Sequence, residues 1–555
     1  MKTKFFLFGI VMMMLITLLN CKKSSVITTT IDAPAVTTSF VVQFFDAADQ
    51  TLIGMNSSRE IKITVLGKNA SEVKDVFGRS VSSVSTHKGI IALTVNHSLT
   101  PSAASPVTFV LDINCEGYLH ASLPVEIAST GGHSFIVRLV NPLAPPDGVA
   151  VFEGIVGRAS ANGALESEID ASTPPVQQTQ ATTKIKILAG TIIRDASGAP
   201  LSGDLTLQMV YYSNQSPVVL DCFPGSFCVK ADNGGILSNG LFFSGGWADY
   251  KMTDASGKIA ATVSDSMMVT MDVPSNTYNP QTKTLIKAGD YFPIWSYNFS
   301  NGTWEFENEG LVQGPKRSGP LCIIYPTIKM PTKRNVDKWI NSVIPVYKII
   351  DEIYYTIYGL YIINIRGVYK TSNTSNATLA GASSPLGSIR LIYKEKSTGF
   401  IYWSSGYLNA SGDRYHIPDQ PCDIPTVIEV WGGCPNALLG SQEVNNLCTN
   451  DSLGIKLDNY QQPAGTVMDV VVNVTANCEF VRIKPNVSAF YDDGCGWKYI
   501  GETVNGKITI PGLEKGKGYS FGAWIDDNWF SDFYIVNEAN YSWNIELPQS
   551  ICSKY

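Results

Sequence analysis

Short runs of alternating hydrophobic and polar residues recur along most of the chain. Residues 61–65 (Ile-Lys-Ile-Thr-Val) and 107–111 (Val-Thr-Phe-Val-Leu) are examples, and each is flanked by turn-forming residues. A period of two places every second side chain on the same face of an extended strand. The recurrence of such runs predicts an all-β protein made of several tandem β-sandwich domains.

Changes in the pattern suggest how the chain is divided. Residues 158–183 contain few large apolar side chains and carry Pro174 and Pro175, which predicts a linker. The stretch 331–365 is apolar, but its proline and charged residues argue against a membrane span, so it is predicted to be a second linker with a short helix and a strand. The predicted β domains cover residues 36–150, 184–313, 366–468 and 469–555.

One aromatic hairpin is predicted within the 184–313 domain. If Asn301 and Gly302 form a two-residue turn, Phe299 lies opposite Trp304, and the aromatic residues on either side share one face. Cross-strand aromatic pairs of this kind stabilise a sheet by about 0.2–1 kcal/mol each. We therefore expect these rings to pack in a core and not to stack on a ligand.

The N-terminus has the pattern of an export signal. Lys2 and Lys4 precede an apolar run over residues 5–19, which is too short to span a bilayer and is followed at once by polar residues. The segment that ends at Cys21 resembles the lipobox of bacterial lipoproteins, which implies cleavage after residue 20 and acylation of Cys21. An ordinary secretory signal with a cysteine there by chance is the alternative. Residues 21–35 are then a lipidated tether.

Composition agrees with an exterior location. Only 16% of residues are charged, compared with about 25% in typical globular proteins. The net charge of −7 argues against a nucleic-acid partner, because phosphate binding needs clustered Lys and Arg. With no acidic retention signal after Cys21, the outer membrane is the expected location, and its periplasmic and cell-surface faces both remain open.

Cysteine usage also fits an oxidising compartment. Cys222 and Cys228 bracket a short turn that suits a local bridge. The sequence has no CxxC pair, which favours disulfides over a zinc site, although it does not fix their pairing. The disulfide candidates are Cys222, Cys228, Cys422, Cys434, Cys448, Cys478, Cys495 and Cys552.

Catalytic and metal-binding patterns are weak. Residues 518–522 match Gly-x-Ser-x-Gly, but no histidine follows them, and the segment reads as a strand and not as the turn that opens a helix. Asp492 and Asp493 are expected to form an ordinary acidic loop and not a calcium site. The sequence predicts no catalytic residue, no metal ligand and no cofactor.

The central segment carries a family resemblance. It comprises Ala189-Gly190-Thr191, Asp195-Ala196-Ser197-Gly198, Phe223-Pro224-Gly225, Asp254-Ala255-Ser256-Gly257, Lys287-Ala288-Gly289-Asp290, Pro293-Ile294-Trp295-Ser296-Tyr297 and Gly302-Thr303-Trp304. In this order the motifs resemble β domains of Bacteroidetes lipoproteins of unassigned function, and they are distantly similar to a domain of the cartilage intermediate layer proteins. Residues 406–418 and 505–519 are similar to hairpins of carboxypeptidase-regulatory-like, transthyretin-type sandwiches. The resemblance implies surface modules without catalytic residues.

Two functions remain open. The first is a lipid-anchored envelope or surface protein that is not an enzyme and has a structural, adhesive or glycan-contacting role. Its expected partners are the membrane, through the lipid anchor, and a glycan or another envelope protein. The second is a polysaccharide hydrolase whose carboxylate pair leaves no sequence signature. Alternation places Trp524 on the opposite face from Phe521, and Trp529 lies near an acidic loop. Trp524 and Trp529 are therefore the predicted glycan contacts, and closure of the sandwich edge by both rings is the alternative.

Overall fold

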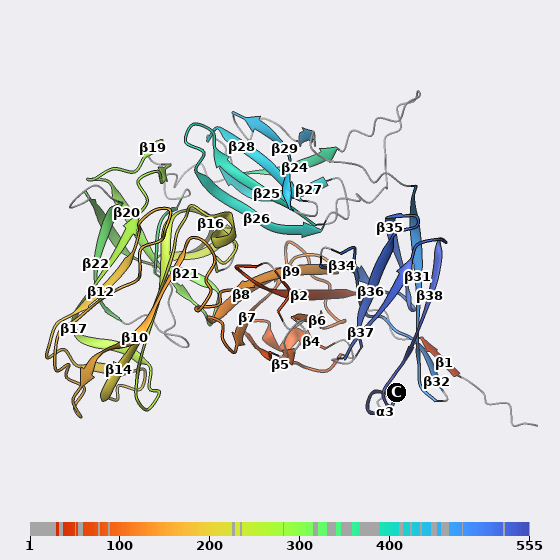
Figure 1. The fold of residues 1–555 in the computed structure, drawn as a ribbon, viewed down its shortest axis with the longest axis horizontal. Coiled ribbons are helices and arrows are strands. Elements are labelled where there is room, and N and C mark those ends of the chain that lie inside the picture. Colours follow the sequence, from red (N-terminus) through yellow and green to blue (C-terminus); the bar gives the residue numbers. More distant parts are fainter. Residues whose placement is uncertain are drawn as a thin grey trace, which may run out of the picture.

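A computed structural model describes most of the chain as strands. The described residues are 29–32, 37–49, 51–53, 59–75, 78–86, 89–224, 228–233, 236–280, 282–314, 320–329, 340–345, 358–366, 388–409, 414–421, 424–432, 436–445, 452–456, 466–479, 481–494, 496–525 and 528–553. They form four β-sandwich domains, as the alternating pattern predicts. The first domain lies between the central domain and the fourth domain, and the third domain lies along one side of this row (Figure 1).

The first domain (residues 38–139) is a sandwich of two four-stranded sheets. One sheet contains β4 (Val73–Lys74), β6 (Ile90–Val95), β2 (Thr38–Asp46) and β9 (Gly131–Leu139), in spatial order. The other contains β5 (Ser83–Thr86), β3 (Ile61–Leu66), β7 (Val107–Cys115) and β8 (Ala121–Ile127). Phe40, Ile63 and Leu111 fill the space between the sheets and are fully buried, so the predicted inward faces are confirmed.

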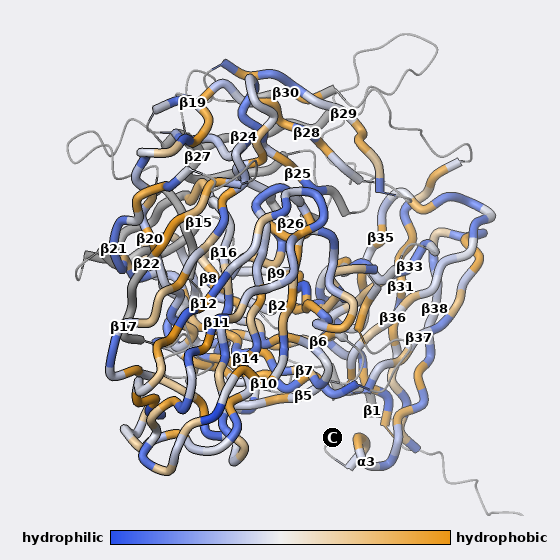
Figure 2. The backbone as a smooth tube through the Cα atoms, turned by 60° about the vertical axis from the view of Figure 1, so that its left-hand side comes forward, coloured by the Kyte–Doolittle hydropathy of each residue, from blue (hydrophilic) through white to orange (hydrophobic). Residues whose placement is uncertain are grey.

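The central domain (residues 149–345) is a twelve-stranded sheet folded around its own core. Its strands are β10 (Val149–Ala159), β11 (Ile169–Ser172), β12 (Thr183–Ile187), β13 (Ile193–Asp195), β14 (Gly203–Tyr212), β15 (Cys228–Asn233), β16 (Ile236–Asp254), β17 (Ala260–Val273), β20 (Tyr291–Asn298), β21 (Thr303–Gln313), β22 (Leu321–Lys329) and β23 (Ile340–Pro345). The short helix α2 (Pro217–Leu220) follows β14, and a small hairpin of β18 (Tyr278–Asn279) and β19 (Thr284–Leu285) projects from the domain. Hydrophobic and hydrophilic positions alternate along many of these strands (Figure 2).

Both predicted linkers contain strands that pair with this domain. Within residues 158–183, β11 pairs with β12, and Leu165, Ile169 and Ala171 are buried in the core. The segment has few apolar side chains, but their spacing places them all on the inner face. They therefore anchor the segment to the core despite its low apolar content. Within residues 331–365, β23 pairs with β16 and β20. The strand predicted near residue 358 is confirmed as β24 (Tyr358–Arg366), whereas the position of the predicted helix lies outside the described residues.

The predicted aromatic hairpin forms, but with a different register. Asn298 pairs with Thr303 and Tyr297 with Trp304, so the loop has four residues and not two. The side chain of Asn298 accepts a hydrogen bond from Ser300 N, and that of Asn301 accepts one from Thr303 N. These side-chain bonds support the longer loop. The rings nevertheless share the buried face, as predicted.

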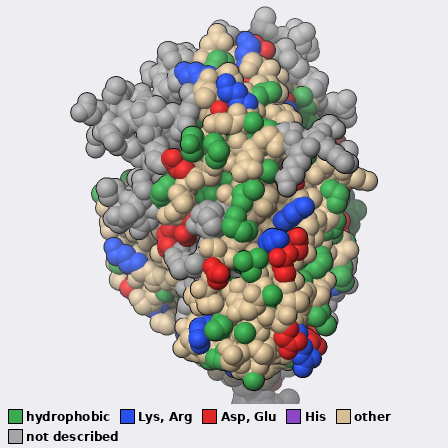
Figure 3. Space-filling view, turned by 90° about the vertical axis from the view of Figure 1, so that its left-hand side faces the viewer, with side chains coloured by type: hydrophobic (Ala, Val, Ile, Leu, Met, Phe, Trp, Pro, Cys, Tyr) green, Lys and Arg blue, Asp and Glu red, His purple; other side chains and the backbone are tan. Residues whose placement is uncertain are grey.

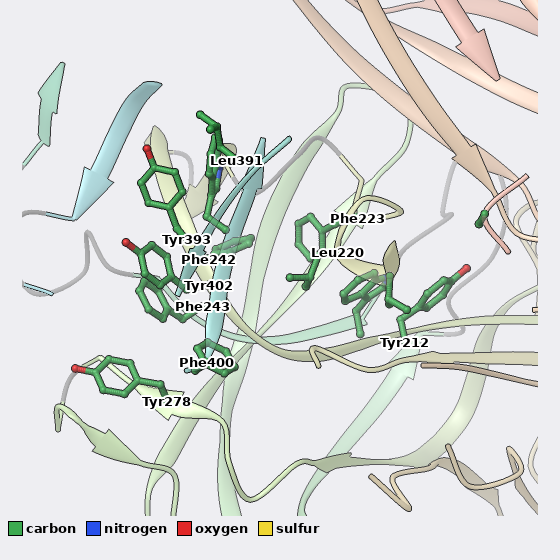
Figure 4. Packing of buried hydrophobic residues seen from close by; sticks show 14 of the residues in the cluster. Tyr212, Leu220, Phe223, Phe242, Phe243, Tyr278, Leu391, Tyr393, Phe400 and Tyr402 are labelled. Carbon is green, nitrogen blue, oxygen red and sulfur yellow. The ribbon is translucent and has the colours of Figure 1, made fainter. Parts of the chain in front are cut away.

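The third domain (residues 358–456) also has two described sheets. The first contains β26 (Ile401–Asn409), β25 (Ser388–Glu395), β28 (Thr426–Gly432) and β29 (Ala437–Val444), and the second contains β27 (Arg414–Pro421), β24 and β30 (Ser452–Lys456). Its apolar face meets the central domain: Tyr402 stacks on Phe243 at 4.8 Å between ring centroids (Figure 4). Both rings are almost fully buried, so the two domains share one core.

The fourth domain (residues 467–553) consists of two sheets and a terminal helix. One sheet is built on β31 (Val467–Asn477), which pairs with β32 (Val481–Lys484), β35 (Lys507–Glu514) and β38 (Asn540–Glu546). The other contains β34 (Trp497–Glu502), β33 (Ser488–Asp492), β36 (Gly518–Ile525) and β37 (Asn528–Ile535). A disulfide between Cys478 and Cys552 holds helix α3 (Gln549–Cys552) against the first sheet.

Part of the predicted tether also belongs to this domain. Strand β1 (Thr29–Asp32) pairs in parallel with β32, so Thr29 lies opposite Val481 and Asp32 opposite Lys484. These four residues of the 21–35 segment therefore extend a sheet instead of acting as a free spacer. In the part of the chain that is described, no helix is long and apolar enough to cross a bilayer.

Candidate functional site

The fourth domain meets the first domain through two tryptophans. Trp524 on β36 and Trp497 on β34 pack against Val41 and Ile90 of the first domain, and both indoles are 7% exposed. Gln43 Nε2 donates a hydrogen bond to the carbonyl oxygen of Trp497 at 3.3 Å. Residues more than four hundred positions apart therefore form one buried junction.

The structure bears on the orientation and exposure of the two predicted glycan contacts, and glycan binding itself stays a prediction. Phe521, Ala523 and Ile525 face the core of the fourth domain, so Trp524 points away from that core, as alternation predicts. However, Trp524 is not an exposed platform, because the first domain covers it. Trp529 is partly buried and packs edge to face on Trp497, with ring centroids 4.8 Å apart.

Gly522 makes this packing possible. It lies on β36 directly opposite Ser531, and a Cβ atom on it would lie 2.2 Å from the ring of Trp529. No side chain fits at that distance. The absence of a side chain at residue 522 therefore lets Trp529 lie flat across β36 and reach Trp497.

A cavity of about 330 Å³ opens beside this junction. Among the described residues, its lining comes from β5, β6 and the turn before β5 in the first domain, and from Trp524 of the fourth domain. The lining residues are Asp75, Arg79, Ser80, Val81, Ser83, Val84, Ser85, Thr86, Ile90, Ile91, Ala92, Leu93 and Trp524. This volume is at the lower end of the range for small-molecule sites.

The lining combines hydroxyl groups, one ion pair and apolar surface. The Asp75 carboxylate accepts hydrogen bonds from the backbone N–H and the guanidinium of Arg79, which closes the turn between them. Ser83 and Ser85 are exposed, on the face of the sheet that carries Lys62. Ile91 and Leu93 face the core of the first domain, whereas Ile90 and Ala92 pack with Trp524. Because β5 is the edge strand of its sheet, its outer backbone groups have no ladder partner among the described strands.

The indole of Trp524 adds a second polar feature. Its Nε1 is buried and has no hydrogen-bond acceptor among the described residues, and the same is true of Trp497 Nε1. A buried donor without an acceptor costs roughly 1–3 kcal/mol. Sequence patterns did not indicate these two buried indole donors at the junction.

A second buried polar cluster joins three domains. Asp221 follows α2 in the central domain, and its carboxylate pairs with Arg138 of β9, at 2.9 Å, and with Arg390 of β25. Ser404 Oγ donates a hydrogen bond to the other carboxylate oxygen at 3.0 Å. All three charged side chains are at most 4% exposed. The sequence analysis did not predict this cluster. Its sequence signal is a single acidic residue, Asp221, within the apolar stretch 218–223.

The cysteines agree only in part with the predictions. Cys478 and Cys552, both candidates, form a bridge. Cys222 has a free thiol whose Sγ donates a weak hydrogen bond to Val218 O, so the predicted local bridge to Cys228 is not formed. Burial at the three-domain cluster raises the pKa of the Cys222 thiol to about 12. Cys21, Cys422, Cys434, Cys448 and Cys495 lie outside the described residues.

The Gly-x-Ser-x-Gly segment is a strand, as the sequence predicts. Ser520 lies inside β36, opposite Phe533, and the segment continues as a strand through Ile525. Asp492 accepts hydrogen bonds from Gly494 N and Gly496 N, as an ordinary acidic turn does. No group of three metal-ligating side chains is present among the residues that the structure describes.

Comparison with known proteins assigns this chain to no family. No protein family matches the chain, and no curated protein matches it significantly, so the resemblances found in the sequence stay predictions. Shaft pilin SpaA from Lactobacillus rhamnosus GG aligns with 35% of this chain and 100% of its own, at 8% identity and a TM-score of 0.16. The Bacillus anthracis TIE protein aligns with 94% of this chain and 73% of its own, at 9% identity and a TM-score of 0.13.

The pilus-presented adhesin Spy0125 (Cpa) gives a similar result. The alignment covers 92% of this chain and 99% of the adhesin, at 10% identity and a TM-score of 0.13. At such identities and TM-scores, none of these structures identifies a shared fold or a shared function.

Proposed function

We propose that this protein is a lipid-anchored cell-envelope protein with a structural or adhesive role, whose β-sandwich body contacts glycans or other envelope components. The observation that carries the proposal is the way in which the four sandwiches are joined. Buried rings between the central and third domains, the Asp221 cluster, and the tryptophan junction make one continuous body. Such a body suits load bearing and the display of a surface.

The surface properties support this role. On the face shown in Figure 3, Lys and Arg side chains are interspersed with Asp and Glu, and hydrophobic side chains are scattered among polar ones. The chain as a whole carries a net charge of −7. A mixed surface with a net charge keeps an exterior protein soluble and limits nonspecific association.

The cavity favours binding over glycan hydrolysis. Hydrolysis of a glycosidic bond generally requires two carboxyl groups, roughly 5–10 Å apart, on either side of that bond. Among the described residues that line the cavity, Asp75 is the sole carboxylate, and it is engaged by Arg79. We therefore assign this cavity to recognition and not to catalysis.

Replacing Cys21 tests the proposal. The Cys21→Ser variant is expected to lose acylation and to move from the detergent phase to the aqueous phase, because two or more acyl chains hold a lipoprotein at a membrane and one polar side chain does not. Mass spectrometry of the N-terminal peptide and detergent-phase partitioning measure this. Cys115→Ser, which alters a buried thiol of the first domain, is the matched control and should partition as the wild type does. An N-terminal peptide of the mature wild-type protein without acyl mass would contradict the anchor.

A further inference from the structure

The sheet that carries Trp524 (β34, β33, β36 and β37) has an outer face that continues beyond the tryptophan junction. The first domain covers one half of this face, over Trp497 and Trp524. The other half carries Phe533 of β37, which is 63% exposed. We infer that this open half binds a glycan by stacking a neutral sugar ring on Phe533. The inference rests on the proposed surface role, and it names the site and the ligand class.

Two glycines of β36 let aromatic rings lie across that strand. A Cβ atom on Gly518 would lie 2.3 Å from the ring of Phe533, just as one on Gly522 would lie 2.2 Å from the ring of Trp529. Neither glycine has a positive φ, so the backbone conformation does not require them. A glycine inside a strand weakens it and often marks a place where another group approaches closely. The same arrangement therefore places one ring in the junction and a second ring on the open half of the face.

The strand register places polar side chains beside the Phe533 ring. Ser520 of β36 lies directly opposite Phe533, and Asp492 of β33 lies opposite Ser520, so the three form one row across three strands. Ser531 precedes Phe533 by two residues on β37 and therefore shares its face. Phe521, the next residue of β36, faces the core of the fourth domain, so the row lies on the outer face.

These polar side chains are able to bond to sugar hydroxyls. The hydroxyl groups of Ser520 and Ser531 make no hydrogen bond to another residue in the described part of the chain, and each can both donate and accept. Asp492 uses one carboxylate oxygen, Oδ1, for both of its described hydrogen bonds, from Gly494 N and Gly496 N. Its carboxylate also disfavours an acidic sugar nearby, so the expected ligand is neutral.

The edge of β37 is closed to an added peptide strand. Phe533 N donates a hydrogen bond to Asp532 Oδ1 at 2.8 Å, and the Asp532 carboxylate also accepts one from Tyr541. Strand addition depends on free backbone groups along a sheet edge, and charged side chains on the edge oppose it. A partner must therefore approach the face of this sheet and not its edge.

The surroundings of Phe533 fit a sugar better than they fit a protein surface. A sugar ring presents C–H groups on its face and hydroxyls around its rim. Phe533 can cover the face, while Ser520 and Ser531 lie beside the rim. Ile535, which is 48% exposed on the same face, extends the apolar surface. The core of a protein–protein interface, in contrast, is depleted of Asp and Ser, and this row contains both.

A titration of the full-length mature protein tests the inference. The probes are methyl glycosides of neutral hexoses and N-acetylhexosamines, followed by neutral oligosaccharides released from envelope and host polysaccharides. Isothermal titration calorimetry and saturation-transfer NMR are expected to show saturable binding of at least one neutral saccharide. Comparing the envelope and host oligosaccharides shows which source supplies the ligand.

Two variants locate the binding. Phe533→Ala removes an exposed ring, so the protein should stay folded while its affinity for the saccharide falls about tenfold or more. Gly518→Ala keeps the ring but puts a methyl group in its place, and the exposed ring can turn aside, so affinity should fall without loss of the fold. Tyr291→Ala is the matched control, because Tyr291 is an aromatic residue of the central domain that is 59% exposed.

The outcomes separate this inference from the proposed anchor. If no saccharide binds, or if Phe533→Ala or Gly518→Ala binds as tightly as Tyr291→Ala while all three melt like the wild type, the assignment is wrong. Self-association that Phe533→Ala abolishes, without saccharide binding, would assign the face to a protein partner and also overturn the inference. An acylated protein that binds no saccharide keeps the anchor and loses the site, and a saccharide-binding protein without an acyl chain keeps the site and loses the anchor.

Discussion

Asp221 of the central domain forms buried ion pairs with arginines of the first and third domains. Its carboxylate pairs with two buried guanidinium groups that come from different domains, Arg138 and Arg390. Removing charges from water is costly, and the cost is recovered only while each charge keeps its partners. The cluster therefore depends on correct docking, because the ion pairs form only when all three domains are in contact.

Replacing Asp221 should therefore be far more damaging than removing a surface charge. We expect Asp221→Ala to lower the free energy of unfolding by about 3–5 kcal/mol, because two buried cations lose their counter-ion. The control is Asp204→Ala, which removes an exposed ion pair with Arg158 and should cost about 1 kcal/mol or less. Urea unfolding of both variants measures the difference. Equal losses would mean that the buried cluster contributes no more than a surface pair.

Among the strands, the short β11 shows that residues 169–172, within the predicted linker, belong to the central domain. It pairs with β12 over four residues and buries Ile169 and Ala171. Just beyond β11, Val176 N donates to Ala181 O, and both side chains are buried. A segment of low apolar content is thereby held in place by regular hydrogen bonds and a few well-placed contacts.

Limited proteolysis should leave this segment intact. Proteases cut accessible, extended loops, whereas this segment is tied to the domain by β11, which pairs with β12, and by the hydrogen bond from Val176 N to Ala181 O. With subtilisin at low concentration, we expect the first products to retain the whole of 158–183 within a fragment that includes β10 and β12. Mass spectrometry of the products identifies the cut sites, and early cleavage between Glu166 and Gln180 would contradict the packing.

Strands were predictable from local pattern, whereas their registers and partners were not. Alternation identified β3, β7 and the strand that contains Ser520, because alternate residues of each face the core of their own domain. The hairpin register depended on side-chain hydrogen bonds of Asn298 and Asn301, which lengthen the loop without changing the apolar pattern. Local pattern sets the buried face, and turn chemistry sets the register.

Contacts between domains lie beyond any local signal. Trp524 was correctly placed on the outer face of β36, but the residues that cover it, such as Val41 and Ile90, lie far away in the sequence. An outward-facing aromatic side chain looks the same in sequence whether it meets a ligand or another domain. The cavity is equally invisible, since its wall includes Trp524 and strands of the first domain.

For the whole molecule, strand β1 fixes which end of the body is near the lipid anchor proposed at Cys21. Thr29 follows Cys21 by eight residues, and a fully extended chain of that length reaches at most about 29 Å. Because β1 is paired with β32, the fourth domain is held within that reach, while the central domain lies at the far end of the row in Figure 1.

Energy transfer to a membrane-surface dye measures this arrangement. A fluorophore on Lys507→Cys in the fourth domain should transfer energy efficiently to the dye, whereas one on Ser197→Cys in the central domain should transfer much less. Both positions are exposed, so labelling should leave the fold unchanged. Equal transfer from the two positions would show that the body tumbles freely above the bilayer.

The pairing of β1 with β32 therefore gives the molecule a base and a tip. With the anchor proposed at Cys21, the last domain in the sequence is the part of the body nearest the membrane, although it is not the domain that follows the anchor in the chain. The central domain then lies farthest from the membrane, within reach of a neighbouring surface.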